Sequence, residues 1–327
     1  MTLQLWNLDS SAYARHPLHC GDRTWPESNC YVDLWIELLH AAGAEPLAAL
    51  AFALAVDVEG DQWTFFKFPQ ADLEALYGVS VFELNVWQPL VLHMTEQLAL
   101  GRPAIVEVDA FHLPDTAGTS YRSAHVKTSI GIQAIDVQAR RLGYFHNAGY
   151  YELGGEDFAG VFRLEGHLTN PEYLPPYVEV VKRGQRPRLS GAALVEASLA
   201  SLRGHLTRRP AGNPFHGYAA RFARDVRWLA DEQPSCFHGY AFATLRQCGA
   251  AFELSSAYLR WLEASGETGL ACAAEACQLI ATVAKALQFK TARAVATRRP
   301  LDATPMLEAM ATAWDETMAT LTSRYAG

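Results

Sequence analysis

A chain of 327 residues is long enough to bury a large core, and its length favours two domains. Half of the residues are hydrophobic and 19% are charged, which excludes an intrinsically disordered protein. No apolar run approaches the roughly 20 residues that span a bilayer, and the N-terminal residues lack the features of a signal peptide. We therefore expect a cytoplasmic protein without a membrane partner, whose six cysteines are reduced thiols.

The formal charge of −8 is unevenly distributed along the chain. Residues 1–170 carry a strong net negative charge, whereas the part from Pro171 to the C-terminus is net positive. The C-terminal part is thus a candidate surface for an acidic partner, although its arginines could equally well solvate helix faces. The sequence shows no recognised nucleic-acid motif, so we expect no nucleic acid as a partner.

The first predicted element is a helix that begins near Cys30. Ser28 or Asn29 can cap it, leucines at helical spacing follow, and Gly43 can end it. Cys30 would lie in the first turn, where unpaired amides and the helix dipole stabilise a thiolate. The alternative is a buried structural thiol, because free cysteine is among the most buried residue types.

Helices and strands with different periods follow in chain order. Helices are predicted over 47–56, 72–77 and 89–99, and strands within 57–68 and over 104–109, 125–136, 142–147 and 161–164. Helices that precede an antiparallel sheet indicate an α+β domain, with the Cys30 helix on that sheet.

A linker and an all-helical domain are predicted for the rest of the chain. The prolines from Pro171 to Pro176 and the basic run Lys182–Arg188 are typical of a linker. Helical patterns follow over 191–206, 218–230, 239–263, 269–296 and 305–325. We place the domains at 1–178 and 179–327.

A cysteine nucleophile needs a base and a group that orients the base. The hairpin predicted around 137–141 would bring His125 near Asn147, at one end of two paired strands. Asn147 would then fix the tautomer of His125 and leave its other nitrogen facing Cys30. His146 competes for the role of Asn147. His16, His19 and Cys20 are close in sequence, but no fourth ligand is evident, and we expect no metal.

Several of these motifs resemble known families. They are Asn29–Trp35, Glu59–Trp63, Glu107–Asp109, Leu113–Thr116, His125–Lys127 and Tyr144–Tyr150. Together they resemble a bacterial family catalogued only as a domain of unknown function. More distantly, the Cys30 helix and the segment from Val108 to His125 are similar to the butirosin-pathway acyltransferase family and to papain-like cysteine peptidases.

The resemblance implies a papain-like catalytic domain and a chemistry. Members of the closer family tend to be encoded beside amino acid:carrier protein ligases and small carrier proteins. This implies an aminoacyltransferase that takes its substrate from the phosphopantetheine of a carrier protein, with no cofactor bound by this chain. Cys30 would carry the acyl group, and His125 would deprotonate an amine acceptor, either a small molecule or a peptide.

Other residues are assigned supporting roles. We expect Asn29 to help the Cys30 amide stabilise the oxyanion, because the glutamine that papain-like enzymes use has no counterpart here. Trp25, Asp109 and Asp115 are candidates for substrate binding, although Asp115 could simply begin a turn. The carrier would dock on basic residues, namely Arg183, Arg186, Arg188, Arg208 and Arg209. A cysteine peptidase or amidase with the same triad, and an inert partner-binding module, remain as alternatives.

Overall fold

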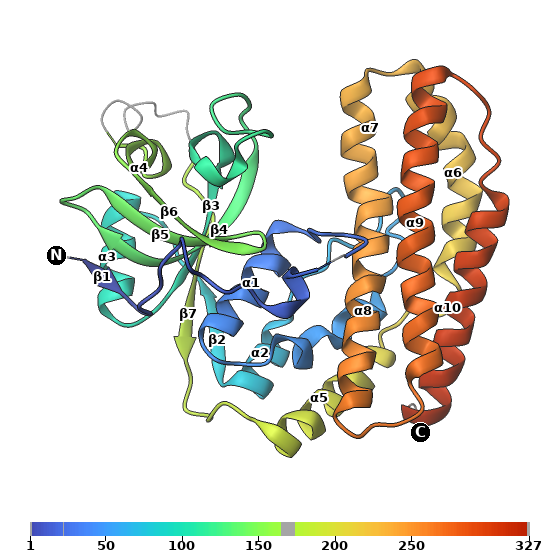
Figure 1. The fold of residues 1–327 in the computed structure, drawn as a ribbon, viewed down its shortest axis with the longest axis horizontal. Helices are drawn as coiled ribbons and strands as arrows, with labels where there is room; N and C mark the ends of the chain where they lie inside the picture. The colour runs from blue at the N-terminus through green and yellow to red at the C-terminus, as the bar shows by residue number, and fades with distance from the viewer. Residues whose placement is uncertain (1, 22, 165–173, 326–327) are drawn as a thin grey trace. The chain divides into compact units, whose positions relative to one another are not determined.

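The computed structural model describes residues 2–21, 23–164 and 174–325 (Figure 1). The chain forms two compact units, and neither is a continuous stretch of sequence. Unit 1 comprises residues 1–20, 29–46 and 73–188, and unit 2 comprises residues 21–28, 47–72 and 189–327.

Unit 1 is built on an antiparallel sheet. Its strands are β1 (Leu3–Gln4), β2 (Val79–Glu83), β3 (Ala104–Asp109), β4 (Lys127–Asp136), β5 (Arg141–His146), β6 (Gly149–Gly154) and β7 (Val178–Arg183). The strand order is β2-β7-β3-β4-β5-β6, and β1 pairs with β4. Side chains alternate between the two faces along each strand, so both faces of the buried strand β4 need cover.

Helices cover the two faces of this sheet. α1 (Cys30–Ala41) lies over Gly131 of β4, where Leu34 and Leu38 pack against the strand. α3 (Leu90–Ala99) contributes Met94 and Leu98 to the core on the other face. The remaining helices are α2 (Gln70–Tyr77), which crosses into unit 2, the short α4 (Glu156–Val161), and the 3-10 turns η1 (Pro17–His19), η3 (Ala110–His112) and η4 (Pro114–Thr116).

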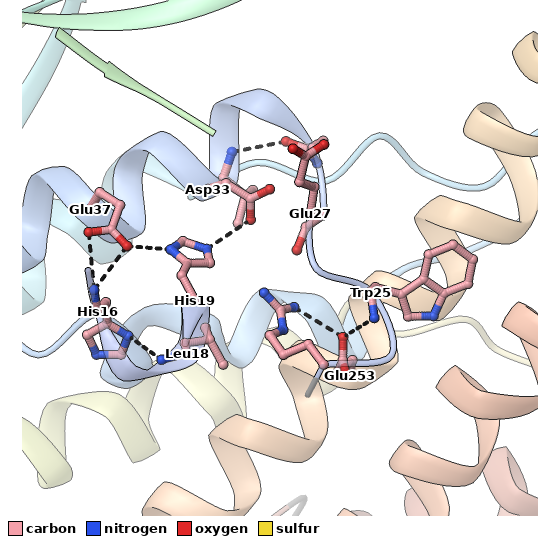
Figure 2. A network of polar contacts seen from close by, with 12 residues as sticks. His16, Leu18, His19, Trp25, Glu27, Asp33, Glu37 and Glu253 are labelled. Atoms are coloured by element: carbon pink, nitrogen blue, oxygen red, sulfur yellow. Dashed lines mark hydrogen bonds and ion pairs between the residues drawn. The ribbon is translucent and has the colours of Figure 1, made fainter. Parts of the chain in front are cut away.

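A buried ionic cluster ties the N-terminal segment to α1 (Figure 2). His19 Nδ1 lies 2.5 Å from Glu37 Oε1, and His19 Nε2 lies 3.3 Å from Asp33 Oδ1. Glu37 also accepts hydrogen bonds from the Tyr13 hydroxyl and from the His16 amide. Among the described residues, no group of three or more His, Cys, Asp or Glu side chains is arranged to hold a metal ion. The His19 ring lies between two carboxylates, which raise its pKa and favour its protonated form.

The chain agrees with the α+β prediction in outline and differs from it in three segments, two in unit 1 and one, 57–68, in unit 2. β7 lies in the segment predicted as a linker, so the boundary placed at residue 179 falls within a strand. The predicted strand 161–164 is instead the end of α4 and the turn after it. The predicted strands within 57–68 are reduced to one bridge between Val58 and Trp63. Pro171 lies outside the described residues.

Unit 2 is helical. It contains the 3-10 helix η2 (Pro46–Ala55), α5 (Gly191–Leu206), α6 (Pro214–Asp231), α7 (Pro234–Ala241), the π-helical turn η5 (Phe242–Arg246), α8 (Gln247–Ala264), α9 (Ala271–Thr297) and α10 (Thr304–Tyr325). Its core includes the buried Trp63, whose ring centroid lies 5.0 Å from that of Phe215. None of the helices in the described residues has the length and apolarity needed to cross a membrane.

Candidate active site

An aspartate–histidine pair lies where β3 ends and β4 begins. His125 Nδ1 is 2.6 Å from Asp109 Oδ2, and the other carboxylate oxygen of Asp109 accepts from the Phe111 amide at 3.0 Å. The Phe111 ring stacks on the imidazole, with a centroid distance of 4.6 Å and an angle of 13°. The His125 ring is thus fixed by a hydrogen bond at its edge and by an aromatic ring on its face.

The pair lines a pocket of about 440 Å³. Its walls are formed by residues from the ends of β3 and α4 and from the loops around them, namely Glu107, Val108, Asp109, Phe111, His112, His125, Gly160, Val161, Arg163 and Pro176. A Cβ at Gly160 would lie only 2.2 Å from His112 Nδ1, so glycine is required for the His112 ring to lie in this wall. The volume is in the range of sites for small molecules.

The surroundings of Asp109 favour its ionised form. Burial alone would raise the pKa of Asp109, but the hydrogen bonds from His125 and the Phe111 amide, with the charges of His125 and His112, lower it. An ionised Asp109 favours the tautomer in which His125 Nδ1 carries a proton, so that Nε2 of the neutral ring is an acceptor. The His125 side chain is 74% exposed, and within the described chain its Nε2 has no hydrogen-bond partner. This arrangement suits a general base.

Cys30 is the first residue of α1, as predicted, and it is half-buried. Asn29 is the N-cap: its side-chain oxygen accepts from the Val32 amide at 3.0 Å. The Asn29 side chain is fully buried, and its role as an oxyanion donor, which its amide nitrogen would have to fill, stays a prediction. Next to Cys30, the Tyr31 hydroxyl donates to Glu179 of β7 at 2.7 Å.

α1 and β4 begin at the same end of the sheet. Beyond the C-terminal end of α1, the Tyr77 hydroxyl donates to the Glu45 carbonyl, and Tyr77 lies just before β2. β2, β7, β3 and β4 are neighbours in the sheet, and each runs antiparallel to the next. The start of β2 and the end of β4 therefore lie at the same end of the strands. The start of α1, with Cys30, therefore points toward the end of the strands where His125 precedes β4.

Cys30 and His125 nevertheless lie at different distances from the level of Gly131, measured along the direction of β4. His125 precedes Gly131 by about 20 Å of extended chain, whereas Cys30 precedes Leu34 by one helical turn, about 6 Å. The imidazole is turned toward Asp109, and no hydrogen bond joins it to Cys30 in the described chain. The approach of the thiol and imidazole stays a prediction.

Asn147 does not orient His125, which corrects the predicted triad. Asn147 occupies the two-residue turn between β5 and β6 with φ of 45°, a conformation that asparagine tolerates well. No hydrogen bond joins it to His125 in the described part of the chain, where Asp109 holds the ring nitrogen instead. Asp109 could have been found from its position at the end of β3, because β3 pairs with β4 on the side opposite β5.

Asp115 and His146 form a separate, buried network. His146 Nδ1 is 2.5 Å from Asp115 Oδ2, its Nε2 is 2.8 Å from Thr128 Oγ1, and Asp115 also accepts from the Tyr144 hydroxyl. The side chains of His146 and Asp115 are 2% and 4% exposed. Both side chains are thus hydrogen-bonded inside the fold, and the predicted roles of His146 beside Cys30 and of Asp115 in substrate binding stay predictions.

Trp25 is also a core residue. It belongs to unit 2, is 2% exposed, and donates from its indole nitrogen to the Ala281 carbonyl at 3.0 Å. The absence of a side chain at Gly249 makes room for its ring, because a Cβ there would lie 2.3 Å from Trp25 Nε1. The predicted role in substrate binding is not compatible with this burial.

The fold and these side chains define a two-unit α+β protein with an acid–base pair at the ends of two central strands of an antiparallel sheet. Residues 14–183 match the model of the DUF1839 N-terminal domain, and residues 191–323 match that of the DUF1839 C-terminal domain. The chain belongs to the DUF1839 family. A comparison with curated proteins finds no match.

Proposed function

We propose that this protein is a cysteine acyltransferase in which Cys30 carries the acyl group and His125, held by Asp109, is the base. The observation that carries the proposal is the His125–Asp109 pair, which lines a pocket at the ends of β3 and β4. The N-terminus of α1, with Cys30, points toward the same end of the strands. A cysteine at a helix N-terminus and an imidazole with an acidic partner are the two parts that thiol acyl transfer needs.

The proposed reaction has two steps. The Cys30 thiolate attacks the carbonyl carbon of a thioester; the new carbon–sulfur bond forms as the old one breaks, and the released thiol takes up a proton. His125 Nε2 then accepts a proton from an amine as its nitrogen attacks the acyl-enzyme. The Cys30–acyl bond breaks, and the sulfur leaves as a thiolate.

For the substrate we propose an aminoacyl group on the phosphopantetheine of an acidic carrier protein, as the sequence resemblance implies. The net positive C-terminal part of the chain supports such a partner. Two of the five predicted docking residues already have backbone partners within their own units: Arg188 donates to the Ala42 carbonyl and Arg209 to the Leu206 carbonyl. Arg183 and Arg186 are exposed on unit 1, and Arg208 is exposed on unit 2.

The test is to mix the protein with a carrier protein charged with an amino acid and to measure the mass increase of the enzyme by mass spectrometry. We expect one acyl group on Cys30, no label on Cys30→Ala, and full labelling of Cys272→Ala, in which an exposed cysteine is removed. With Asp109→Asn we expect the acyl-enzyme to form and its transfer to amines to slow. Equal labelling of wild type and Cys30→Ala would refute the proposal, and a stable complex without any label would favour an inert binding module.

Hydrolysis is a second candidate, favoured by one observation. The His125 side chain is 74% exposed, so water can reach the base that would otherwise activate an amine. Thioester loss measured with and without a panel of amines separates the two reactions. Turnover that depends on the amine supports transfer, whereas the same rate without any amine supports a hydrolase.

A further inference from the structure

Unit 2 contains a cavity of about 630 Å³ between α6, α10 and the segment that leads into α10. α6 contributes residues spaced by four and three, Phe215, Ala219 and Phe222, so one helical face forms one wall. The Asn213 side chain donates to the Ala311 carbonyl at 2.8 Å and holds the start of α6 against α10.

The wall is apolar, and small residues leave its space open. Phe215, Phe222 and Leu307 are buried behind the surface, and Ala219 and Ala311 lie where larger side chains would fill the groove. A volume of this size accommodates a small organic molecule.

The charged lining of this cavity has one sign. Its carboxylates are Asp302, Glu308 and Asp315, and no lysine or arginine is among the residues that line it. Asp302 caps α10 through the Thr304 amide at 3.0 Å. Glu308 and Asp315 lie about one and three turns after Thr304 on α10, and their carboxylates make no side-chain hydrogen bond or ion pair with any described residue.

We propose that this cavity binds an organic cation, an ammonium group attached to an apolar body. The ammonium would lie between Glu308 and Asp315, and the body would lie against the apolar wall formed by α6 and Leu307. Two uncompensated carboxylates lower the free energy of a cation at the rim and raise that of an anion. The proposal does not depend on acyl transfer, since it concerns residues of unit 2 alone.

The test is calorimetric titration of the full chain with 2-phenylethylammonium and, as its neutral counterpart, 2-phenylethanol. The titration is carried out at pH 8, where the amine is protonated. We expect the amine to bind at least about 5-fold more tightly than the alcohol, because exposed ion pairs contribute about 0.2–1 kcal/mol each.

Variants locate the site. Glu308→Gln with Asp315→Asn should remove the preference for the amine, Ala219→Phe should fill the cavity and abolish binding of both compounds, and Glu275→Gln, an exposed carboxylate on α9, should change nothing. Circular dichroism of each variant checks the fold. Equal affinity for amine and alcohol, no binding of either, or unchanged amine binding by the double variant would overturn the proposal.

Discussion

Replacing His19 by alanine should strongly destabilise unit 1, because it would leave two buried carboxylates without their shared cation. The side chains of His19, Asp33 and Glu37 are all 0% exposed (Figure 2). Burial alone would lower the pKa of His19, but the hydrogen bonds and charges of Asp33 and Glu37 outweigh it and raise the pKa. The folded protein therefore holds a proton that the unfolded chain releases more easily.

The magnitude follows from the burial of this cluster. Removing one partner of a buried ion pair costs about 3–5 kcal/mol, which corresponds to a fall in Tm of roughly 10 °C for a unit of this size. The sign of the pH dependence is also set. The contribution of His19 is complete below the unfolded pKa of about 6.5 and is lost as the pH rises through its higher folded pKa.

Urea denaturation of wild type and His19→Ala, followed by circular dichroism between pH 5.5 and 8.5, measures both effects. The matched control is His40→Ala, whose ring makes one exposed hydrogen bond, to the Ala14 carbonyl, and which should cost less than about 1 kcal/mol. A loss below 1 kcal/mol for His19→Ala, or the same pH slope in both proteins, would show that His19 is not the cation of this cluster.

The other predictions concern the pocket and the units. Asp109→Asn should lower amine-dependent turnover by about 10²- to 10⁴-fold, which stopped-flow thioester assays measure; an unchanged rate would show that Asp109 does not assist His125 in the reaction. Gly160→Ala should destabilise the protein by about 1–3 kcal/mol, since the new methyl group meets the His112 ring, and a normal melting curve would contradict this contact. A chain ending at Leu189 should expose Trp63 to water, which would appear as red-shifted fluorescence. A native emission maximum would argue against the packing of Trp63 on Phe215 in unit 2.

Local patterns predicted the elements whose burial repeats regularly. β3 matches its predicted limits because an apolar run ends at Asp109, and α5 matches because its pattern lies between a linker and basic residues. β7 was missed since the prolines before it and the basic residues after it outweighed a short run of valines. Strand pairing over a long sequence distance, here with β2 and β3, then decided the structure of that segment.

The candidate site was predicted in part for a similar reason. The sequence places His125 before β4, and the hairpin to β5 suggested Asn147 as its partner. β4, however, has a neighbour on each side, and in the β3 ladder Asp109 is paired with Lys127, two residues from His125. An orienting group therefore came from the non-hairpin neighbour, which local sequence does not identify.

The interleaved order of the two units has a consequence for how the protein is made. Residues 47–72 leave the ribosome before most of the sheet, yet Trp63 finds its aromatic partners in helices that begin after residue 213. The apolar side chains of this early segment stay exposed to water while more than 140 residues are synthesised. Contacts between residues so distant in sequence also form slowly. Removal of the N-terminal part of the chain would therefore also take residues 21–28 and 47–72 out of unit 2.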